Sequence, residues 1–351
     1  MYREHTKAVK IGNRVIGGGN PILIQSMTNT KTEDVQATVA QIQALTAAGC
    51  DIIRCAVPTQ EAAKALKEIK KQITIPLVAD IHFDYKLALA AIEAGVDGLR
   101  LNPGNIGDER KVRYLADVLK ERKIPIRIGV NTGSLEKELK NLNPADALVE
   151  SAKRHIKILE NAGFFDIIVS LKSSDVRTSV AAARKFSKEF DYPLHLGVTE
   201  AGTFERGIIK NTAGLSPLLL DGIGDTIRIS LTADPVEEVI AGRMLLKSLG
   251  LNDDSEVIAC PTCARTEIPL FELATKVEKM LAGTKGLKVA VMGCVVNGVG
   301  EGEKADFGIA GGKEKSVIFE KGKITKTIDN SLIFDEINAL IAKYKAQNEK
   351  I

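Results

Sequence analysis

The chain has 351 residues, of which 44% are hydrophobic and 26% are charged, and its 48 basic and 45 acidic residues leave a net charge of +3. This composition predicts an ordinary soluble core spread over two domains, and so small a net charge gives no reason to expect a nucleic-acid partner. No stretch approaches the roughly 20 apolar residues of a membrane span and the N-terminus lacks the apolar core of a signal peptide, so we expect a cytoplasmic protein without a membrane partner.

Residues 8–16 place a Gly-Asn pair between two short apolar runs, which predicts a β-hairpin. After residue 19 a β-branched run followed by a helical stretch recurs to about residue 250. The eight predicted strands are 22–27, 51–57, 76–81, 98–101, 125–130, 166–171, 193–198 and 226–231. Eight such units predict a closed (β/α)8 TIM barrel over residues 1–251. An open doubly wound sheet is the alternative, because a strand count does not show closure.

Polar and basic residues stand near the carboxyl ends of these strands, where the chemistry of such barrels is located. They are Arg54, Asp80, His82, Arg100, Asn102, Arg127, Asn131, Lys172, His195, Glu200, Arg228 and Ser230. Any single arginine is explained more simply by a salt bridge to a neighbouring acid. As a set, cations at one level of the barrel predict a phosphate or diphosphate site. For His82 and His195, a role in holding neighbouring residues in place and direct contact with a substrate are equally good explanations.

Residues 252–255 interrupt the pattern and predict a linker to a small α/β domain over residues 252–351. Its predicted strands are 256–259, 288–292, 306–310, 316–320 and 323–327, and its predicted helices are 267–281 and 332–347.

Three cysteines converge in this second domain, Cys260 and Cys263 as a C-x-x-C pair and Cys294 on a predicted glycine-rich loop. In a reducing compartment such a pair indicates metal binding or catalysis before a disulfide. No further cysteine or histidine stands nearby in the sequence, and Glu301 is the nearest hard ligand. Three thiolates and one oxygen donor favour an iron–sulfur cluster with one loosely held iron, and a zinc site or an unligated thiol group are the alternatives.

Seven segments spread along the chain resemble the bacterial 4-hydroxy-3-methylbut-2-enyl diphosphate synthase family of the non-mevalonate isoprenoid pathway. They are 25–30 (QSMTNT), 54–58 (RCAVP), 80–83 (DIHF), 100–105 (RLNPGN), 196–202 (LGVTEAG), 260–265 (CPTCAR) and 292–298 (MGCVVNG). The resemblance implies a barrel like that of dihydropteroate synthase and a C-terminal domain like the cluster-binding repeat of sulfite reductases.

The resemblance also implies an activity: reductive ring opening and dehydration of 2-C-methyl-D-erythritol 2,4-cyclodiphosphate to 4-hydroxy-3-methylbut-2-enyl diphosphate. Two electrons would come from flavodoxin or ferredoxin through one 4Fe-4S cluster, in a homodimer whose active site is shared between chains. The residues implied are Cys260, Cys263, Cys294 and Glu301 for the cluster, Glu200 and Asn297 for catalysis, and Arg265 with the other residues at the strand ends for substrate binding. A non-redox iron–sulfur hydrolyase acting on a phosphorylated substrate and a non-catalytic iron–sulfur sensor are the alternatives.

Overall fold

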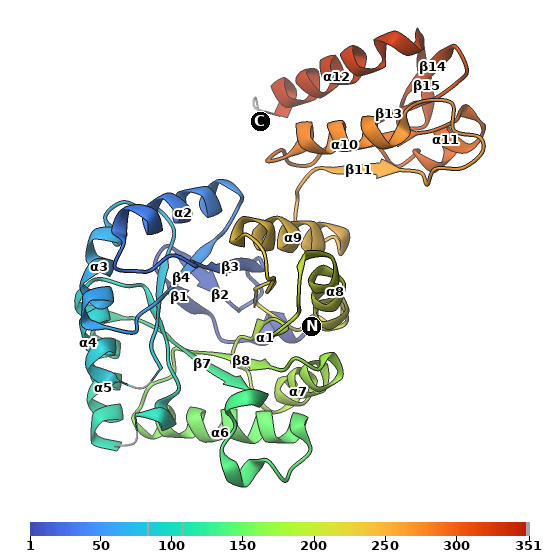
Figure 1. The fold of residues 1–351 in the computed structure, drawn as a ribbon. Coiled ribbons are helices and arrows are strands. Elements are labelled where there is room, and N and C mark those ends of the chain that lie inside the picture. The colour runs from blue at the N-terminus through green and yellow to red at the C-terminus, as the bar shows by residue number, and fades with distance from the viewer. Residues whose placement is uncertain (83, 107–108, 349–351) are drawn as a thin grey trace. The chain divides into compact units, whose positions relative to one another are not determined.

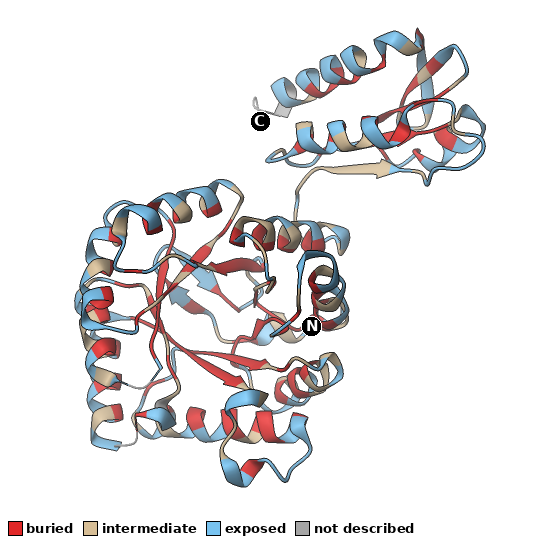
Figure 2. Ribbon diagram, in the orientation of Figure 1, coloured by how far each residue is buried: buried red, intermediate tan, exposed pale blue. Residues whose placement is uncertain are grey.

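The computed structural model describes residues 1–82, 84–106 and 109–348 of the chain. They fold into two compact units, Met1–Leu251 and Asn252–Ile351 (Figure 1). Each unit has a hydrophobic core of its own, and the inward faces of its helices are buried while their outward faces are exposed (Figure 2). None of the described helices combines the length and the apolar character needed to span a bilayer.

The first unit is a barrel of parallel strands. The strands are β3 (Leu23–Met27), β4 (Ile52–Ala56), β5 (Leu77–Asp80), β6 (Gly98–Arg100), β7 (Ile126–Asn131), β8 (Ile167–Lys172), β9 (His195–Leu196) and β10 (Thr226–Ile227). They pair in the order β8-β7-β6-β5-β4-β3-β10-β9, and Val169 of β8 bridges to Leu194 just before β9. The sheet therefore closes on itself, which confirms the predicted barrel and excludes the open doubly wound sheet.

β9 and β10 are shorter than the sequence predicts. A backbone hydrogen bond from Arg228 N to Leu196 O (3.0 Å) still joins them beyond the regular ladder. At Gly197 the chain passes so close to its neighbours that a Cβ would lie 2.6 Å from Lys172 Nζ and 2.8 Å from Arg228 O. This close approach requires glycine and accompanies the end of regular pairing.

Helices cover the outside of the barrel (Figure 1). They are α2 (Val35–Ala47), α3 (Gln60–Lys70), α4 (Tyr85–Glu93), α5 (Glu109–Arg122), α6 (Pro144–Asn161), α7 (Val176–Glu189), α8 (Phe204–Leu220) and α9 (Pro235–Ser248). Polar side chains cap several of them: Asp34, Thr59 and Asp175 each accept a hydrogen bond from a backbone N–H of the first turn. These caps satisfy donors that have no partner inside the helix.

The N-terminal hairpin closes the amino end of the barrel. It consists of β1 (Val9–Ile11) and β2 (Arg14–Ile16), which confirms the prediction for residues 8–16. Its side chains form one apolar cluster with Leu23, Ile52 and Val78, which lie at the amino ends of their strands. With the amino end filled in this way, the carboxyl end of the barrel is left for a site.

The second unit is a five-stranded sheet in the order β11-β12-β13-β14-β15. Its elements are β11 (Glu256–Ala259), α10 (Leu270–Leu281), β12 (Lys288–Met292), α11 (Val295–Glu301), β13 (Phe307–Ala310), β14 (Lys315–Glu320), β15 (Lys323–Asp329) and α12 (Ile333–Asn348). β11, β12 and β13 are parallel, whereas β14 and β15 form an antiparallel meander with β13.

The sequence predicts a glycine-rich loop after β12, and the structure has the short helix α11 there instead. Its Gly298 is needed for packing, because a Cβ on it would lie 2.8 Å from the Met292 Cβ and 2.9 Å from the Ala310 Cβ. The glycine thus lets the helix approach the sheet, and Cys294 becomes the residue that precedes the helix. The prediction of a loop over residues 295–301 is therefore wrong.

Candidate active site

Five cationic side chains lie close together in the barrel. They are Arg54, Arg100, Arg127, Lys172 and Arg228, called the cationic cluster below. Burial first, and then the charges of the four arginines, hold the pKa of Lys172 well below its usual range. Burial and two arginine neighbours likewise lower the pKa of Arg54 to about 10, although Asp80 opposes this. The cations that the sequence places near the strand ends are therefore close enough to perturb one another.

Asp80 holds one side of the cationic cluster. Its Oδ1 lies 3.3 Å from Arg100 Nη1, and its Oδ2 lies 3.7 Å from both Arg54 Nε and His82 Nε2. Burial alone would raise the pKa of Asp80, but the contact with His82 and the charges of the two arginines outweigh burial and keep this pKa well below its usual range. Asp80 therefore carries its negative charge at neutral pH.

Glu238, in the first turn of α9, holds the other side, and sequence analysis missed it. Its carboxylate accepts hydrogen bonds from Arg228 Nε (3.2 Å) and Nη2 (3.4 Å), from the Leu231 N–H (3.0 Å) and from Ser26 Oγ (3.4 Å). The residue is only 4% exposed. In the sequence it is an ordinary acidic residue at a helix start, and nothing marks it as a partner of a distant arginine.

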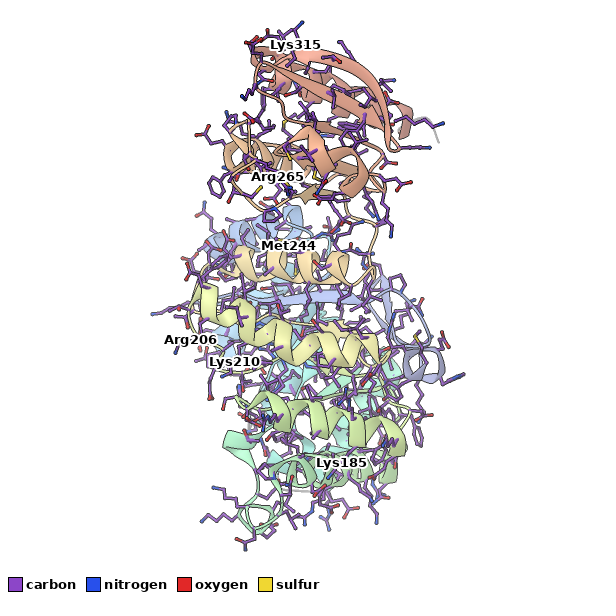
Figure 3. All side chains as sticks on the ribbon, turned by 90° about the vertical axis from the view of Figure 1, so that its right-hand side faces the viewer. Lys185, Arg206, Lys210, Met244, Arg265 and Lys315 are labelled. Carbon is purple, nitrogen blue, oxygen red and sulfur yellow. The ribbon has the colours of Figure 1, made fainter. Side chains whose placement is uncertain are left out.

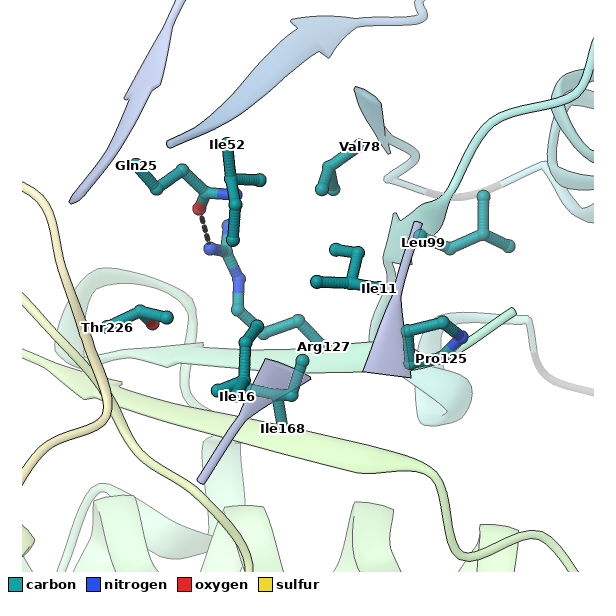
Figure 4. A pocket seen from close by; sticks show the side chains of 11 residues that line it. Ile11, Ile16, Gln25, Ile52, Val78, Leu99, Pro125, Arg127, Ile168 and Thr226 are labelled. Carbon is teal, nitrogen blue, oxygen red and sulfur yellow. Dashed lines mark hydrogen bonds between the residues drawn. The ribbon is translucent and has the colours of Figure 1, made fainter. Parts of the chain in front are cut away.

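Arg127 lies inside the barrel and is buried, whereas the sequence led us to expect it on the rim. Its Nη1 donates to Gln25 Oε1 across a small cavity that Ile11 and Ile16 of the hairpin also line (Figure 4). Burial, then the charge of Arg54, holds its pKa well below the usual range. Within the described part of the chain its Nε is one of few buried polar side-chain atoms without a hydrogen-bond partner.

Lys172 and His195 form a buried chain of polar contacts. Lys172 Nζ lies 3.2 Å from His195 Nε2, and His195 Nδ1 lies 2.8 Å from Thr226 Oγ1. Burial, together with the nearby cations, keeps the pKa of His195 well below its usual range, so this histidine is neutral. A neutral imidazole can bridge a lysine amine and a hydroxyl without adding a further positive charge.

The predicted asparagines both make local contacts. The Asn102 amide clamps Gly129 of β7, with Nδ2 donating to Gly129 O (3.0 Å) and Oδ1 accepting from Gly129 N (2.8 Å). Asn131 Oδ1 accepts from Gly133 N (2.9 Å) in the turn that follows β7. Ser230 is half-buried after β10, where its backbone is bonded to the Asn211 side chain. These contacts fix the loops at the carboxyl ends of the strands.

Glu200 is exposed in the loop between β9 and α8 and has a left-handed backbone, with φ +54°. Its carbonyl oxygen accepts a hydrogen bond from Lys210 Nζ (3.2 Å) on α8, the helix on which Figure 3 labels Lys210. For any residue other than glycine, a left-handed backbone conformation is unfavourable in free energy. Such strained conformations concentrate at functional positions.

In the second unit, Cys260 and Cys294 follow the adjacent parallel strands β11 and β12, which pair up to Ala259 and Val291. Gly293 N donates a hydrogen bond to Cys260 Sγ (3.2 Å), so this sulfur lies beside the residue that precedes Cys294. Cys263 is exposed, and a backbone hydrogen bond at Arg265 (labelled in Figure 3), followed by that residue's side chain, lowers its pKa. All three cysteines are free thiols.

The remaining predicted residues of this unit lie on α11, where Asn297 and Glu301 are both exposed. In the ranges that the structure describes, no three Cys, His, Asp or Glu side chains are gathered as ligands of a single metal ion. The arrangement thus brings Cys260 and Cys294 to the carboxyl ends of two adjacent strands, and it leaves Cys263 exposed three residues after Cys260 and Glu301 exposed at the end of α11.

Comparison with known proteins identifies the chain's relatives. Residues 6–243 match the GcpE TIM-barrel domain, and residues 256–343 match the GcpE protein C-terminal domain. The chain is 56% identical over 347 residues (97% of this chain, 98% of the relative) to the 4-hydroxy-3-methylbut-2-en-1-yl diphosphate synthase (flavodoxin) of Caldanaerobacter subterraneus subsp. tengcongensis. It is 55% identical over 342 residues (96% and 98%) to the Clostridium acetobutylicum protein of the same name.

Among solved structures, the dihydropteroate synthase of Stenotrophomonas maltophilia matches 70% of this chain and 97% of its own, with a TM-score of 0.54. At 13% identity this likeness shows the barrel fold alone. The family matches cover both units, and the curated relatives cover nearly the whole chain. The chain therefore belongs to the GcpE family, together with the 4-hydroxy-3-methylbut-2-en-1-yl diphosphate synthases.

Proposed function

We propose that this protein opens the ring of 2-C-methyl-D-erythritol 2,4-cyclodiphosphate and removes one hydroxyl group as water, giving 4-hydroxy-3-methylbut-2-enyl diphosphate. The reaction takes up two electrons and two protons, breaks one carbon–oxygen bond of the ring and releases one water. The observation that carries the proposal is the cationic cluster: among the residues that the structure describes, three of its five members contact a buried carboxylate, Arg54 and Arg100 at Asp80 and Arg228 at Glu238. Such an excess of positive charge suits a doubly anionic ligand.

Three of the arginines are held in place by carboxylates before the ligand binds. Asp80 and Glu238 hold Arg54, Arg100 and Arg228 by one edge, so that the planar guanidinium groups are already oriented. The members of the cationic cluster bind the diphosphate in this proposal. The further residues that we propose for substrate binding are Asp80, His82, Asn102, Asn131, His195, Ser230 and Arg265.

We propose that Cys260, Cys263, Cys294 and Glu301 hold a 4Fe-4S cluster. Two thiols at adjacent strand ends, an N–H directed at Cys260 Sγ and the lowered pKa of Cys263 all suit binding as thiolates. A four-iron cluster bonds each ligand to a different iron, so its ligands need not converge on one point as those of a single ion do. When bound, the cluster supplies the two electrons of the reaction.

Two residues act on the departing hydroxyl group in this proposal. Glu200 donates a proton to it, and the Asn297 side-chain amide donates a hydrogen bond to it. The exposed position of Glu200 beside the carboxyl end of β9 lets its carboxyl group regain a proton from solvent after each turnover.

The electron donor in this proposal is flavodoxin or ferredoxin, the protein is a cytoplasmic homodimer, and its active site is shared between chains. The names of the curated relatives specify flavodoxin, and this supports flavodoxin as the electron donor of the present chain as well.

The test is anaerobic reconstitution with iron and sulfide, followed by electron paramagnetic resonance with and without the cyclodiphosphate and by mass spectrometry of the product. We expect about four irons per chain, a signal that changes with substrate, and the linear diphosphate only when a reductant is present. Dehydration without a reductant would replace the proposal by the hydrolyase. Zinc in place of iron, or a cluster signal indifferent to substrate without turnover, would reject it in favour of the zinc or sensor alternatives.

A further inference from the structure

The sulfur of Met27 lies where donors from two arginines meet. Arg54 Nη2 and Nε lie 2.9 Å and 3.2 Å from Met27 Sδ, and Arg228 Nη1 lies 3.7 Å from it. Met27 ends β3 and pairs in register with Arg54 of β4, while Arg228 follows β10, the other neighbour of β3. The three side chains therefore come from adjacent strands at the carboxyl end of the barrel.

Two of these donors, Arg54 Nη2 and Arg228 Nη1, are left over by the buried carboxylates. Glu238 takes Arg228 Nε and Nη2, and Asp80 lies 3.7 Å from Arg54 Nε. Arg228 Nη1 and Arg54 Nη2 are then directed at the sulfur. A thioether is a neutral and weak acceptor, so the strongest donors of the site are paired with one of the weakest acceptors that a protein offers.

We propose that Met27 Sδ holds, in the free protein, the position that one anionic oxygen of the diphosphate takes in the complex, and that the Met27 side chain turns away when the ligand binds. This inference rests on the proposed function, because it concerns the same anion site. The polarisable sulfur keeps Arg54 and Arg228 in place without a net charge, and it yields to a phosphate oxygen because charge-assisted bonds are stronger.

The geometry allows the exchange. Met27 is only partly buried, and its unbranched side chain has three rotatable bonds, so the sulfur can leave without movement of the β3 backbone. A negatively charged residue at this position would neutralise the arginines permanently and compete with the ligand. A neutral thioether therefore occupies the anion position in the free protein and competes only weakly with the ligand for the two arginines.

The test observes the Met27 methyl group directly. The chain has five methionines, so protein labelled with ¹³C at the methionine methyl groups gives a simple spectrum, and Met27→Leu assigns the resonance. Met244 on the outer face of α9 is 62% exposed and serves as the internal control (Figure 3). During titration of the reconstituted protein with the cyclodiphosphate we expect the Met27 resonance to shift and to saturate with the ligand, while the Met244 resonance stays in place.

Two substitutions test the competition. Met27→Gln offers the arginines a stronger amide acceptor, and we expect it to raise the dissociation constant of the cyclodiphosphate about tenfold. Met27→Leu removes the acceptor and should bind the ligand at least as tightly as the parent protein. Met244→Gln is the matched control and should leave the constant unchanged. Unaltered melting temperatures exclude misfolding as the cause.

The outcomes separate this inference from the proposed function. A ligand that binds while the Met27 resonance stays in place, or Met27→Leu binding more weakly than Met27→Gln, would overturn the inference alone. If the cyclodiphosphate moves no resonance and has no measurable affinity, the proposed function fails together with it.

Discussion

Two buried carboxylates hold cationic side chains of the barrel site in ion pairs. Asp80 contacts Arg54, Arg100 and His82, and Glu238 contacts Arg228. Removing one partner of such a pair is costly, since it leaves the other charge buried and uncompensated. The carboxylates thus stabilise a cluster of cations whose mutual repulsion would otherwise oppose folding.

Replacing Glu238 by Gln should expose this repulsion. We expect the free energy of unfolding of the barrel to fall by about 3 kcal/mol, because Arg228 loses its counter-charge in a mostly buried site. Inorganic pyrophosphate should then raise the melting temperature of Glu238→Gln by more than that of the parent, since the added anion replaces the lost charge. The neighbouring Glu237→Gln is the matched control. Equal pyrophosphate shifts in both variants would contradict the argument.

Glu200 permits a test of catalysis that leaves the fold alone. Glu200→Gln keeps the size of the side chain and the left-handed backbone but cannot donate a carboxylic proton, so we expect turnover to fall about 100-fold or more. Substrate affinity, iron content and melting temperature should remain those of the parent. Steady-state kinetics with a chemical reductant measures the effect, and wild-type turnover in a variant with its cluster intact would remove Glu200 from its role as the acid.

At the scale of elements, α11 depends on a glycine that no side chain can replace. Gly298→Ala would put a methyl group within 2.9 Å of the β-carbons of Met292 and Ala310, so we expect the second unit to lose about 1–3 kcal/mol of stability. Gly300 lies in the same helix with nothing within 4 Å of its Cβ position, and Gly300→Ala should stabilise the unit by about 0.5–1 kcal/mol. Thermal unfolding followed by calorimetry compares the two, and equal effects would show that close packing is not the cause.

Asp225, the residue before β10, should make the stability of the barrel depend on pH. Asp225 is 1% exposed and accepts hydrogen bonds from Leu194 N (2.8 Å) and Thr6 Oγ1 (3.3 Å). Burial raises its pKa to about 6, although these bonds and the charge of Arg3 oppose the shift. Because the folded state holds this proton more tightly than the unfolded chain does, the stabilisation is complete below about pH 4 and is lost as the pH rises through 6.

Asp225→Asn should remove that dependence. The difference in unfolding free energy between the parent and the variant is expected to change by about 2–3 kcal/mol between pH 4 and pH 7, with the parent losing stability as the pH rises. Urea titrations at several pH values measure it. A difference that stays constant over this range would show that Asp225 does not titrate with a raised pKa.

The elements show which parts of the fold the sequence could predict. The eight barrel strands and the hairpin were predictable because β-branched runs, helical stretches and glycine stops are local signals. The helix α11 was missed, since its Gly298 is explained only by contact with Met292 and Ala310, which lie on other elements. The same holds for the site: basic residues near strand ends were predictable, whereas the depth of Arg127 and the pairing of Glu238 depend on how distant segments pack.

For the whole molecule, the two parts of the proposed chemistry reside in different compact units. The cationic cluster belongs to Met1–Leu251, and the three thiols belong to Asn252–Ile351. The proposed reaction needs both. They could come from one chain or, as the family resemblance leads us to expect, from two chains of a homodimer. Mixed dimers of two inactive variants distinguish these possibilities.

Arg100→Glu should abolish diphosphate binding, and Cys294→Ser should abolish the cluster. If each site combines the first unit of one chain with the second unit of its partner, a mixed dimer has one site with both defects and one with neither. Equal mixing of the two variants should then restore about a quarter of wild-type activity, because half of the dimers are mixed and each has one of two sites intact. Mixing Arg100→Glu with Arg228→Glu is the matched control and should restore none, since every site then carries a defective barrel. No recovery in the first mixture, with mixed dimers demonstrated by native mass spectrometry, would show that each chain builds its own site.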